Sequence, residues 1–177
     1  VEKEKIEQST DTPTLDQKEN LIKISREDAL NENERVGFEN ENVIGSISLK
    51  GAAIDDLTFK NYNLELGGDE KIILLGPRNI DKGYLIESGF VTSDKNIDIP
   101  NSETIWSIKG NKKLTENSPI SLSWTNDQGI TFKKEISLDD KYLFSIKQSV
   151  INSTNNKYEF YSYGQRIRNQ IPDIIDF

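Results

Sequence analysis

The 177-residue chain contains no cysteine, no histidine and no methionine. Without cysteine there is no disulfide, no thiolate nucleophile and no cysteine zinc site. Without histidine the usual general base near neutral pH is absent as well. No run of the sequence approaches the roughly 18 apolar residues that a membrane-spanning helix requires. These absences exclude most catalytic templates and leave carboxylate, Ser/Lys or Tyr chemistry, or binding without chemistry.

Basic residues are also in the minority. The chain has 22 lysines and arginines against 30 aspartates and glutamates, a net charge of -8. Affinity for nucleic acid depends on cationic side chains that neutralise phosphates, so we expect no nucleic-acid partner. The chain begins at Val1 and lacks methionine. We therefore expect it to be part of a longer protein whose anchor or export signal lies outside it.

The composition changes along the chain and predicts three regions. Residues 1–24 mix both charges with Ser, Thr and Gln, and they cannot bury enough apolar area to offset the entropy of ordering, so we predict a disordered or extended tether. Residues 25–42 are predicted to hold a short helix over 25–31, opened by Ser25 with Asp28 three positions later, and a lead-in. We predict one β-sandwich domain over 43–177.

In the first half of that domain, apolar residues recur at every second position. Val43, Gly45, Ile47 and Leu49 alternate with outward positions, as in a half-buried antiparallel strand. A continuous apolar strand, KIILLGP at 71–77, follows. These patterns favour an all-β fold.

The second half predicts an antiparallel meander. Apolar alternation runs over 120–124, 130–138 and 142–150, and short Asn/Asp-rich turns separate the runs. A fourth strand over 158–167 is predicted to continue the same sheet. Each strand has one apolar and one polar face, which indicates a sandwich of two layers.

Three groups of polar residues are candidates for chemistry. Asp94, Asn96 and Asp98 have the oxygen spacing that opens a calcium loop, but the required Gly and Glu are replaced by Ile99 and Ile105. We therefore interpret them as a polar loop. The sequence predicts no metal, no cofactor and no catalytic residue.

The other two groups are the aspartate pairs, of which there are two, and one pair of lysines. Neighbouring residues on a strand point to opposite faces, so Asp55 and Asp56 cannot share a proton there. We predict that this pair and the pair at 139–140 are turn residues. Lys133 and Lys134 are interpreted as solvated turn charges.

Aromatic residues could stack on sugar rings, but the pattern favours packing in the core. Trp124 falls on the same face as Ile120 and Leu122, and Trp106 is also assigned to the core. The residues predicted to share one core across three strands are Trp124, Phe132, Ile136, Phe144 and Ile146.

Several segments occur together in a recognisable order. They are Arg35-Val36, NVIGSISLKGAAIDDLTFKNY at 42–62, KIILLGP at 71–77, Pro100, Trp106, SLSWTNDQGITFKKEISLDDKYLFSIKQSVIN at 121–152, and YSYGQRIR at 161–168. In these segments the chain resembles the first periplasmic domain of the YidC family of membrane-protein insertases. The signature positions, to which we assign structural roles, are Gly45, Ile47, Gly51, Ala52, Asp55, Leu57, Tyr62, Pro77, Trp106, Trp124, Gly129, Phe132, Asp139, Tyr142, Phe144, Asn152, Tyr163 and Gly164. Gln165 and the Lys133-Lys134 pair depart from the family pattern.

The resemblance implies a large twisted β-sandwich similar to the galactose mutarotase fold, and it implies that the C-terminal part of the domain is missing from this chain. Mutarotases use histidine for proton transfer, so that activity is not carried over to this chain. The implied role is accessory and non-enzymatic: docking to the Sec translocon or holding nascent membrane proteins at the periplasmic face of the inner membrane. We expect a monomeric domain, tethered by helices outside this chain. The alternative is a glycan-binding or vestigial sugar-processing module.

Overall fold

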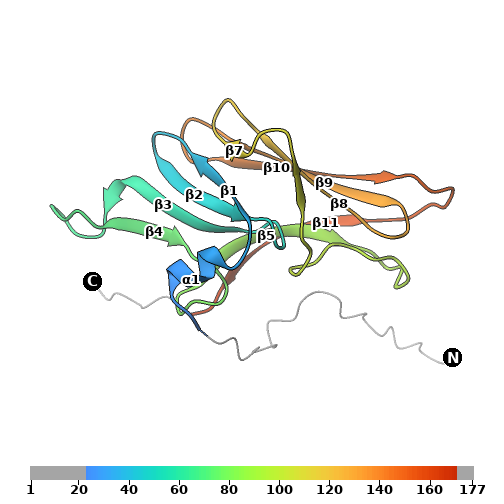
Figure 1. Cartoon of the computed structure of the whole chain (residues 1–177), viewed down its shortest axis with the longest axis horizontal. Coiled ribbons are helices and arrows are strands. Elements are labelled where there is room, and N and C mark those ends of the chain that lie inside the picture. The colour runs from blue at the N-terminus through green and yellow to red at the C-terminus, as the bar shows by residue number, and fades with distance from the viewer. Residues whose placement is uncertain (1–22, 171–177) are drawn as a thin grey trace, which may run out of the picture.

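The computed structural model describes residues 23–170, so most of the predicted tether and residues 171–177 lie outside the described residues. The described part contains one short helix and eleven strands (Figure 1). In chain order they are α1 Arg26–Asn31, β1 Arg35–Glu39, β2 Val43–Ser48, β3 Ile54–Asn63, β4 Lys71–Leu75, β5 Tyr84–Val91, β6 Ser107–Lys109, β7 Lys113–Leu114, β8 Ile120–Thr125, β9 Ile130–Leu138, β10 Phe144–Asn152 and β11 Tyr161–Arg168.

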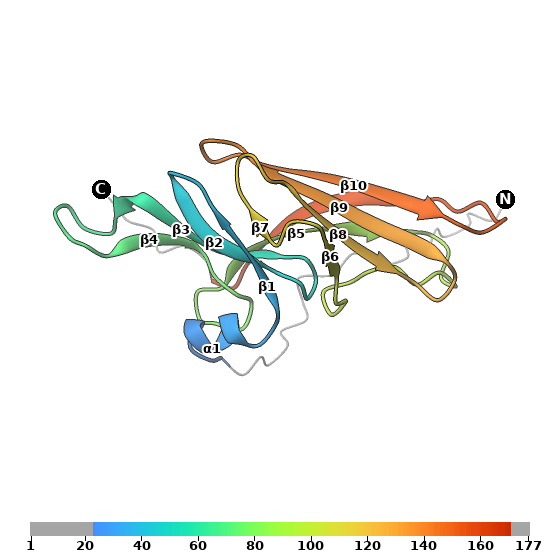
Figure 2. The ribbon, with the colours of Figure 1, turned by 45° about the horizontal axis from the view of Figure 1, so that its top comes forward.

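The strands form two sheets that pack as the layers of a sandwich (Figures 1 and 2). The seven-stranded sheet has the order β11-β5-β3-β2-β1-β7, with β4 also paired to β3, and the four-stranded sheet has the order β10-β9-β8-β6. Pairing is antiparallel throughout except between β1 and β7. The all-β sandwich with one short helix is therefore confirmed. The β3–β4 hairpin projects beyond the four-stranded sheet (Figure 2).

The first elements form as the sequence predicts. Ser25 caps α1, because its hydroxyl accepts a hydrogen bond from the Asp28 amide at 3.1 Å. In β2 the side chains of Val43 and Ile47 are buried. Gly45 lies between them, and a Cβ there would be 1.9 Å from the carbonyl oxygen of Asp56. The close approach of β2 and β3 therefore requires glycine at this position.

The meander is confirmed for three strands and wrong for the fourth. β8, β9 and β10 are consecutive antiparallel neighbours, with Trp124 opposite Phe132 and Phe132 opposite Val150. The last strand, β11, instead pairs with β5 of the other sheet, where Tyr163 lies opposite Gly89.

The connection between β10 and β11 explains this change of sheet. Residues 153–160 are too many for a tight hairpin turn, and they carry two aromatic rings. The ring centroid of Phe160 is 5.3 Å from that of Phe132, and Tyr158 packs beside Phe160 at 6.3 Å. The segment at 158–160, predicted as the start of a strand, instead crosses to the second layer with both rings partly buried against the core.

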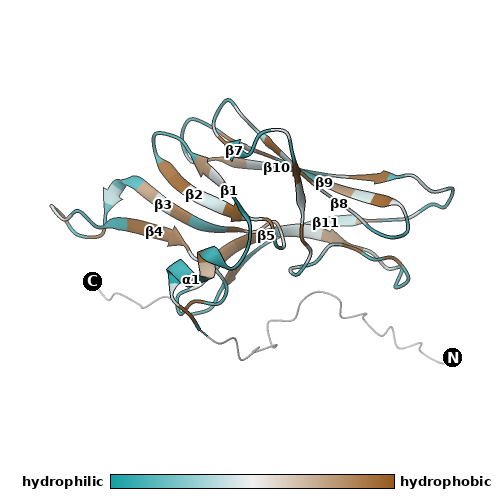
Figure 3. Cartoon of the chain, viewed as in Figure 1, coloured by the Kyte–Doolittle hydropathy of each residue, from teal (hydrophilic) through white to brown (hydrophobic). Residues whose placement is uncertain are grey.

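One hydrophobic core lies between the sheets, and Figure 3 shows polar residues concentrated in the loops. Phe132 and Ile136 are fully buried. Trp124, Phe144 and Ile146 are half-buried and pack against the same core. The five residues predicted to share a core therefore do so. The two on β10 are less covered because β10 is an edge strand.

Replacing Phe132 with alanine is expected to lower the free energy of unfolding by about 3–5 kcal/mol. The ring is fully buried and contacts the rings of Phe90 and Phe160, so its removal leaves a cavity. Phe144→Ala should cost less, because the Phe144 ring is only half-buried, although it packs edge-on against Phe38. Urea denaturation of both variants checks the ranking, and the reverse order would contradict the placement of the core.

Candidate functional site

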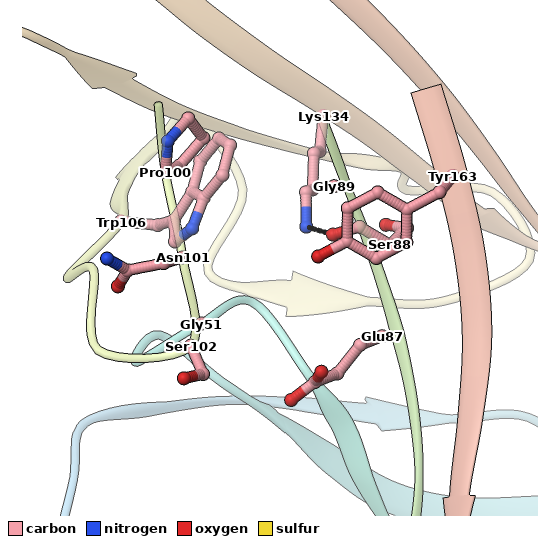
Figure 4. A pocket seen from close by; sticks show the side chains of 10 residues that line it. All are labelled: Gly51, Glu87, Ser88, Gly89, Pro100, Asn101, Ser102, Trp106, Lys134 and Tyr163. Atoms are coloured by element: carbon pink, nitrogen blue, oxygen red, sulfur yellow. Dashed lines mark hydrogen bonds between the residues drawn. The ribbon is translucent and has the colours of Figure 1, made fainter. Parts of the chain in front are cut away.

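A small pocket lies where the two sheets meet. It is lined by Gly51, Glu87, Ser88, Gly89, Pro100, Asn101, Ser102, Trp106, Lys134 and Tyr163. In Figure 4, Lys134 from β9 and Tyr163 from β11 reach toward β5, and Trp106 faces them across the pocket. Segments that are distant in the sequence thus bring polar groups together inside the sandwich.

Lys134 is the unexpected member of this group. Its side chain lies in the inward row of β9 with Phe132 and Ile136, and it is only 1% exposed. The interpretation of Lys134 as a solvated turn charge is therefore wrong, and Lys133 also lies in β9 rather than in a turn. The alternation that predicts the strand also places Lys134 inward, so the signal was present in the sequence.

The ammonium group of Lys134 has two protein partners. Its Nζ donates a hydrogen bond to the Ser88 carbonyl oxygen at 2.5 Å and lies 4.8 Å from the centroid of the Trp106 ring. A desolvated cation over an indole ring is stabilised by about 2 kcal/mol. Burial lowers the pKa of Lys134 to about 8, against the opposing effect of the Glu87 charge. The lysine thus ties β9 to β5 at a cost in charge solvation.

Glu87 organises the other side of the pocket. Its carboxylate accepts hydrogen bonds from Arg78 and, at 3.1 Å, from Gln165. Gln165, which departs from the family pattern, therefore has a specific partner here. Burial raises the pKa of Tyr163, and the Glu87 charge adds to this effect. A Cβ on Gly89 would lie 2.7 Å from the Tyr163 ring, so the ring packs directly on glycine.

The size of the pocket limits what it can hold. Its volume is about 10 Å³, the space of one water molecule. The Nε1 of Trp106 is buried there without a protein partner, and it could donate to such a water. A sugar ring or an organic cofactor does not fit. The arrangement therefore serves the packing of the two sheets.

A second polar cluster lies in the other half of the large sheet. Asp55 and Asp56 are inside β3 and are 8% and 9% exposed, so their prediction as turn residues is wrong. Arg35 of β1 donates to Asp55, and Arg26 of α1 donates to Asp56. Ser46 also donates to Asp56 at 2.7 Å. Burial raises the pKa of Asp55, while Arg35 acts to lower it.

The other acidic candidates lie in loops, as predicted. The Asp139 carboxylate accepts from the amides of Leu143 and Lys141 at 2.8 and 2.9 Å, and these bonds lower its pKa. Asp94 accepts from the amide of Asn96 at 3.0 Å in an exposed turn. Within residues 23–170 there is no group of three or more acidic side chains placed to hold a metal ion.

The signature positions are spread over the fold, and the structure brings only some of them together. Gly51, Trp106 and Tyr163 line the pocket with Lys134. Gly51 and Ala52 form a turn with φ of 72° and 53°, and Gly129 has a φ of 86° in the turn before β9. The remaining positions lie on β2 and β3 (Gly45, Ile47, Asp55, Leu57, Tyr62), just after β4 (Pro77), on β8 to β10 and their loop (Trp124, Phe132, Asp139, Tyr142, Phe144, Asn152), and on β11 (Gly164). Their structural roles stay a proposal.

Breaking the pair of Arg35 with Asp55 is expected to cost much stability, although the intact pair adds little compared with apolar residues of similar size. Arg35→Met leaves a carboxylate buried without its cation and should cost about 3–5 kcal/mol. In the double variant Arg35→Met/Asp55→Asn the uncompensated charge is gone, so the loss should be smaller than the sum of the single losses by more than about 1 kcal/mol. A double-mutant cycle in urea measures this coupling, and additive losses would contradict the pairing.

Lys134 should make stability rise with pH. Between pH 7 and 9.5 the unfolded chain keeps the proton on Lys134, whose ordinary pKa is 10.5, while the folded protein loses it near pH 8. Unfolding therefore takes up protons, and the free energy of unfolding should rise by about 2 kcal/mol across this window. Urea titrations of Lys134→Met should lose the rise, and those of Lys133→Met, the neighbouring control, should retain it. An equal slope in Lys134→Met would exclude Lys134 as the source.

Comparisons with known proteins match the chain over nearly its whole length. The YidC periplasmic domain family matches residues 35–175. The chain is 62% identical over 177 residues to a membrane protein insertase YidC of Pelagibacter ubique (strain HTCC1062), covering 100% of the chain and 32% of that protein. It is 38% identical over 145 residues to the insertase YidC of Rhizobium meliloti (strain 1021), covering 81% and 24%.

A third relative, the insertase YidC of Brucella suis biovar 1 (strain 1330), is 35% identical over 151 residues, covering 85% of the chain and 25% of that protein. The chain thus spans at most about a third of the length of these relatives. Among residues 23–170, the single helix is too short to cross a membrane. The chain belongs to the family of YidC periplasmic domains, which places it on the periplasmic side of the inner membrane.

Proposed function

We propose that the chain is a non-catalytic docking or substrate-holding module of a membrane protein insertase. The observation that carries the proposal is the distribution of apolar side chains on its surface. Large apolar residues that are more than a third exposed are Ile44, Tyr62, Leu64, Leu66, Ile73, Leu74, Ile86, Ile105, Tyr142, Leu143, Ile151 and Tyr161. Scattered exposed apolar residues are ordinary, but Tyr62, Leu64 and Leu66 follow one another at the β3–β4 hairpin, and neighbouring exposed apolar groups are typical of a surface that binds other proteins.

The buried titratable groups support the same proposal. Lys134, Asp55 and Glu87 are each engaged by protein partners within the fold. Their charges therefore stabilise the packing of strands, and a reacting group would need at least one atom free toward a substrate. We propose the Sec translocon and nascent membrane proteins as the partners.

The glycan-binding alternative has less support. Sugar stacking requires an exposed aromatic face beside polar groups in a groove. Trp106 is only 2% exposed, the Trp124 ring packs against Phe132 with centroids 5.9 Å apart, and the exposed Tyr62, Tyr142 and Tyr161 do not line the pocket. Saturable binding of a sugar at millimolar concentration or tighter would nevertheless favour this alternative.

Replacing residues 35–170 in the full-length insertase with an unrelated β-sandwich of similar size tests the proposed role. Insertion of substrates should continue largely unchanged, because the proposal gives this module no part in the insertion step itself. Co-purification of the translocon or of nascent substrate should fall several-fold. Loss of insertion for all substrates while the rest of the protein remains folded would contradict the accessory role.

A further inference from the structure

Three loops lie at the same end of the seven-stranded sheet, and the second of them, the β3–β4 hairpin, projects beyond the other two (Figures 1 and 2). They are the turn 40–42, the hairpin segment 63–71 and the loop 139–143. Side-chain amides join the first loop to the third, because Asn40 donates to the carbonyl oxygens of Asp139 and Lys141 at 2.9 and 2.8 Å, and Asn42 donates to that of Asp140 at 2.9 Å. Hydrogen bonds between these loops therefore hold this end of the sheet together.

An aromatic cluster connects the hairpin to the same region. The Phe59 ring lies 5.6 Å from that of Tyr62 and 5.9 Å from that of Tyr142, measured between centroids. Beyond this cluster, Leu64 and Leu66 lie near the tip of the hairpin. We call these three loops, with Tyr62 at the end of β3, the three-loop surface.

The apolar side chains of the three-loop surface are well exposed. Leu66 is fully accessible and Leu64 is 62% exposed, while Tyr62, Tyr142 and Leu143 are 51%, 43% and 63% exposed. Leucines in this position add nothing to the hydrophobic core, since their surface stays in water. An apolar partner would remove this area from water.

The charge on the same surface is strongly negative. Its carboxylates are Glu41, Glu65, Asp69, Glu70, Asp139 and Asp140, and its lysines are Lys71 and Lys141. The Asp139 carboxylate is held in its charged form by two backbone amides. An apolar patch with an acidic rim is complementary to a ligand that carries both apolar and cationic groups.

We propose that the three-loop surface binds an extended polypeptide segment in which apolar side chains alternate with lysine or arginine. The inference rests on the proposed function, since it gives the holding role a location and a ligand chemistry. The exposed leucines and tyrosines contact the apolar side chains, and the acidic rim pairs with the cations and accelerates the encounter. Anionic lipid headgroups fit less well, because the excess of carboxylates repels them.

Fluorescence anisotropy with the full chain and labelled synthetic peptides tests the proposal. The probe is a peptide of alternating leucine and lysine, about 12 residues long, and the control is a leucine and glutamate peptide of the same length. We expect saturable binding of the lysine peptide, at least about tenfold tighter than the control, that weakens as NaCl rises toward about 150 mM.

Two sets of variants locate the site. Leu64→Ser/Leu66→Ser should weaken binding at least about tenfold, whereas Ile105→Ser, at a residue 60% exposed elsewhere, should change it by less than about twofold. Glu65→Gln/Asp69→Asn/Glu70→Gln should reduce affinity and salt dependence. The matched control Asp94→Asn/Asp98→Asn/Asp127→Asn removes the same charge from exposed loops outside the three-loop surface, and it should have little effect.

Equal losses in the site and control variants would overturn the proposal. Binding to vesicles of anionic and zwitterionic phospholipid that is lost in Leu64→Ser/Leu66→Ser would overturn it as well and would assign the surface to the membrane. If replacing residues 35–170 weakens partner association but Leu64→Ser/Leu66→Ser leaves peptide binding unchanged, this inference fails and the proposed function stands. If peptide binding behaves as expected while the replacement has no effect, the proposed function fails.

Discussion

Two neighbouring carboxylates inside β3 are the constraint around which the N-terminal half of the fold is arranged. Asp55 and Asp56 are both buried, and like charges this close in a medium of low polarity are tolerated only when each has a cation. Arg35 reaches Asp55 from β1, and Arg26 reaches Asp56 from α1. The helix is therefore held to the sheet mainly by charge, because it buries only Ala29, while β1 is also held by its pairing with β2 and by buried Val36 and Phe38.

A buried charge that needs a partner also connects the two layers of the sandwich. Lys134 is buried in the inward row of β9, and its nearest acceptor is the Ser88 carbonyl oxygen of β5 in the other sheet. A lysine in that row fixes the lateral position of the two sheets more sharply than an apolar side chain would, because a hydrogen bond is directional and dispersion contacts are not. The pocket beside Trp106 is then the residual space around a charged cross-link, which explains why it is only large enough for one water molecule.

Much of this architecture follows from local patterns in the sequence. The alternation of apolar and polar residues predicts β2, β8, β9 and β10, and the Ser25 cap predicts α1. Each of these signals is contained in a few consecutive residues of the sequence. The ion pairs of Asp55 and Asp56 could not be found in this way, since their partners lie 20 and 30 positions earlier in the chain. Turn propensity described their local preference correctly, but long-range pairing overrode it. The predicted sheet of β11 was wrong for a related reason. The link from β10 packs its aromatic rings against Phe132, and this long-range contact is not visible in the local pattern.

Charge and apolar surface are thus distributed in an unusual way. Buried ion pairs add little net stability compared with apolar residues of similar size, and exposed leucines add none. A sequence shaped by stability alone would place Leu64 and Leu66 in the interior and the charges of Asp55 and Lys134 outside. The buried charges are explained by the precise alignment that they impose on strands and layers. The exposed leucines have no comparable role among the described residues, and the proposed peptide contact at the three-loop surface gives them one.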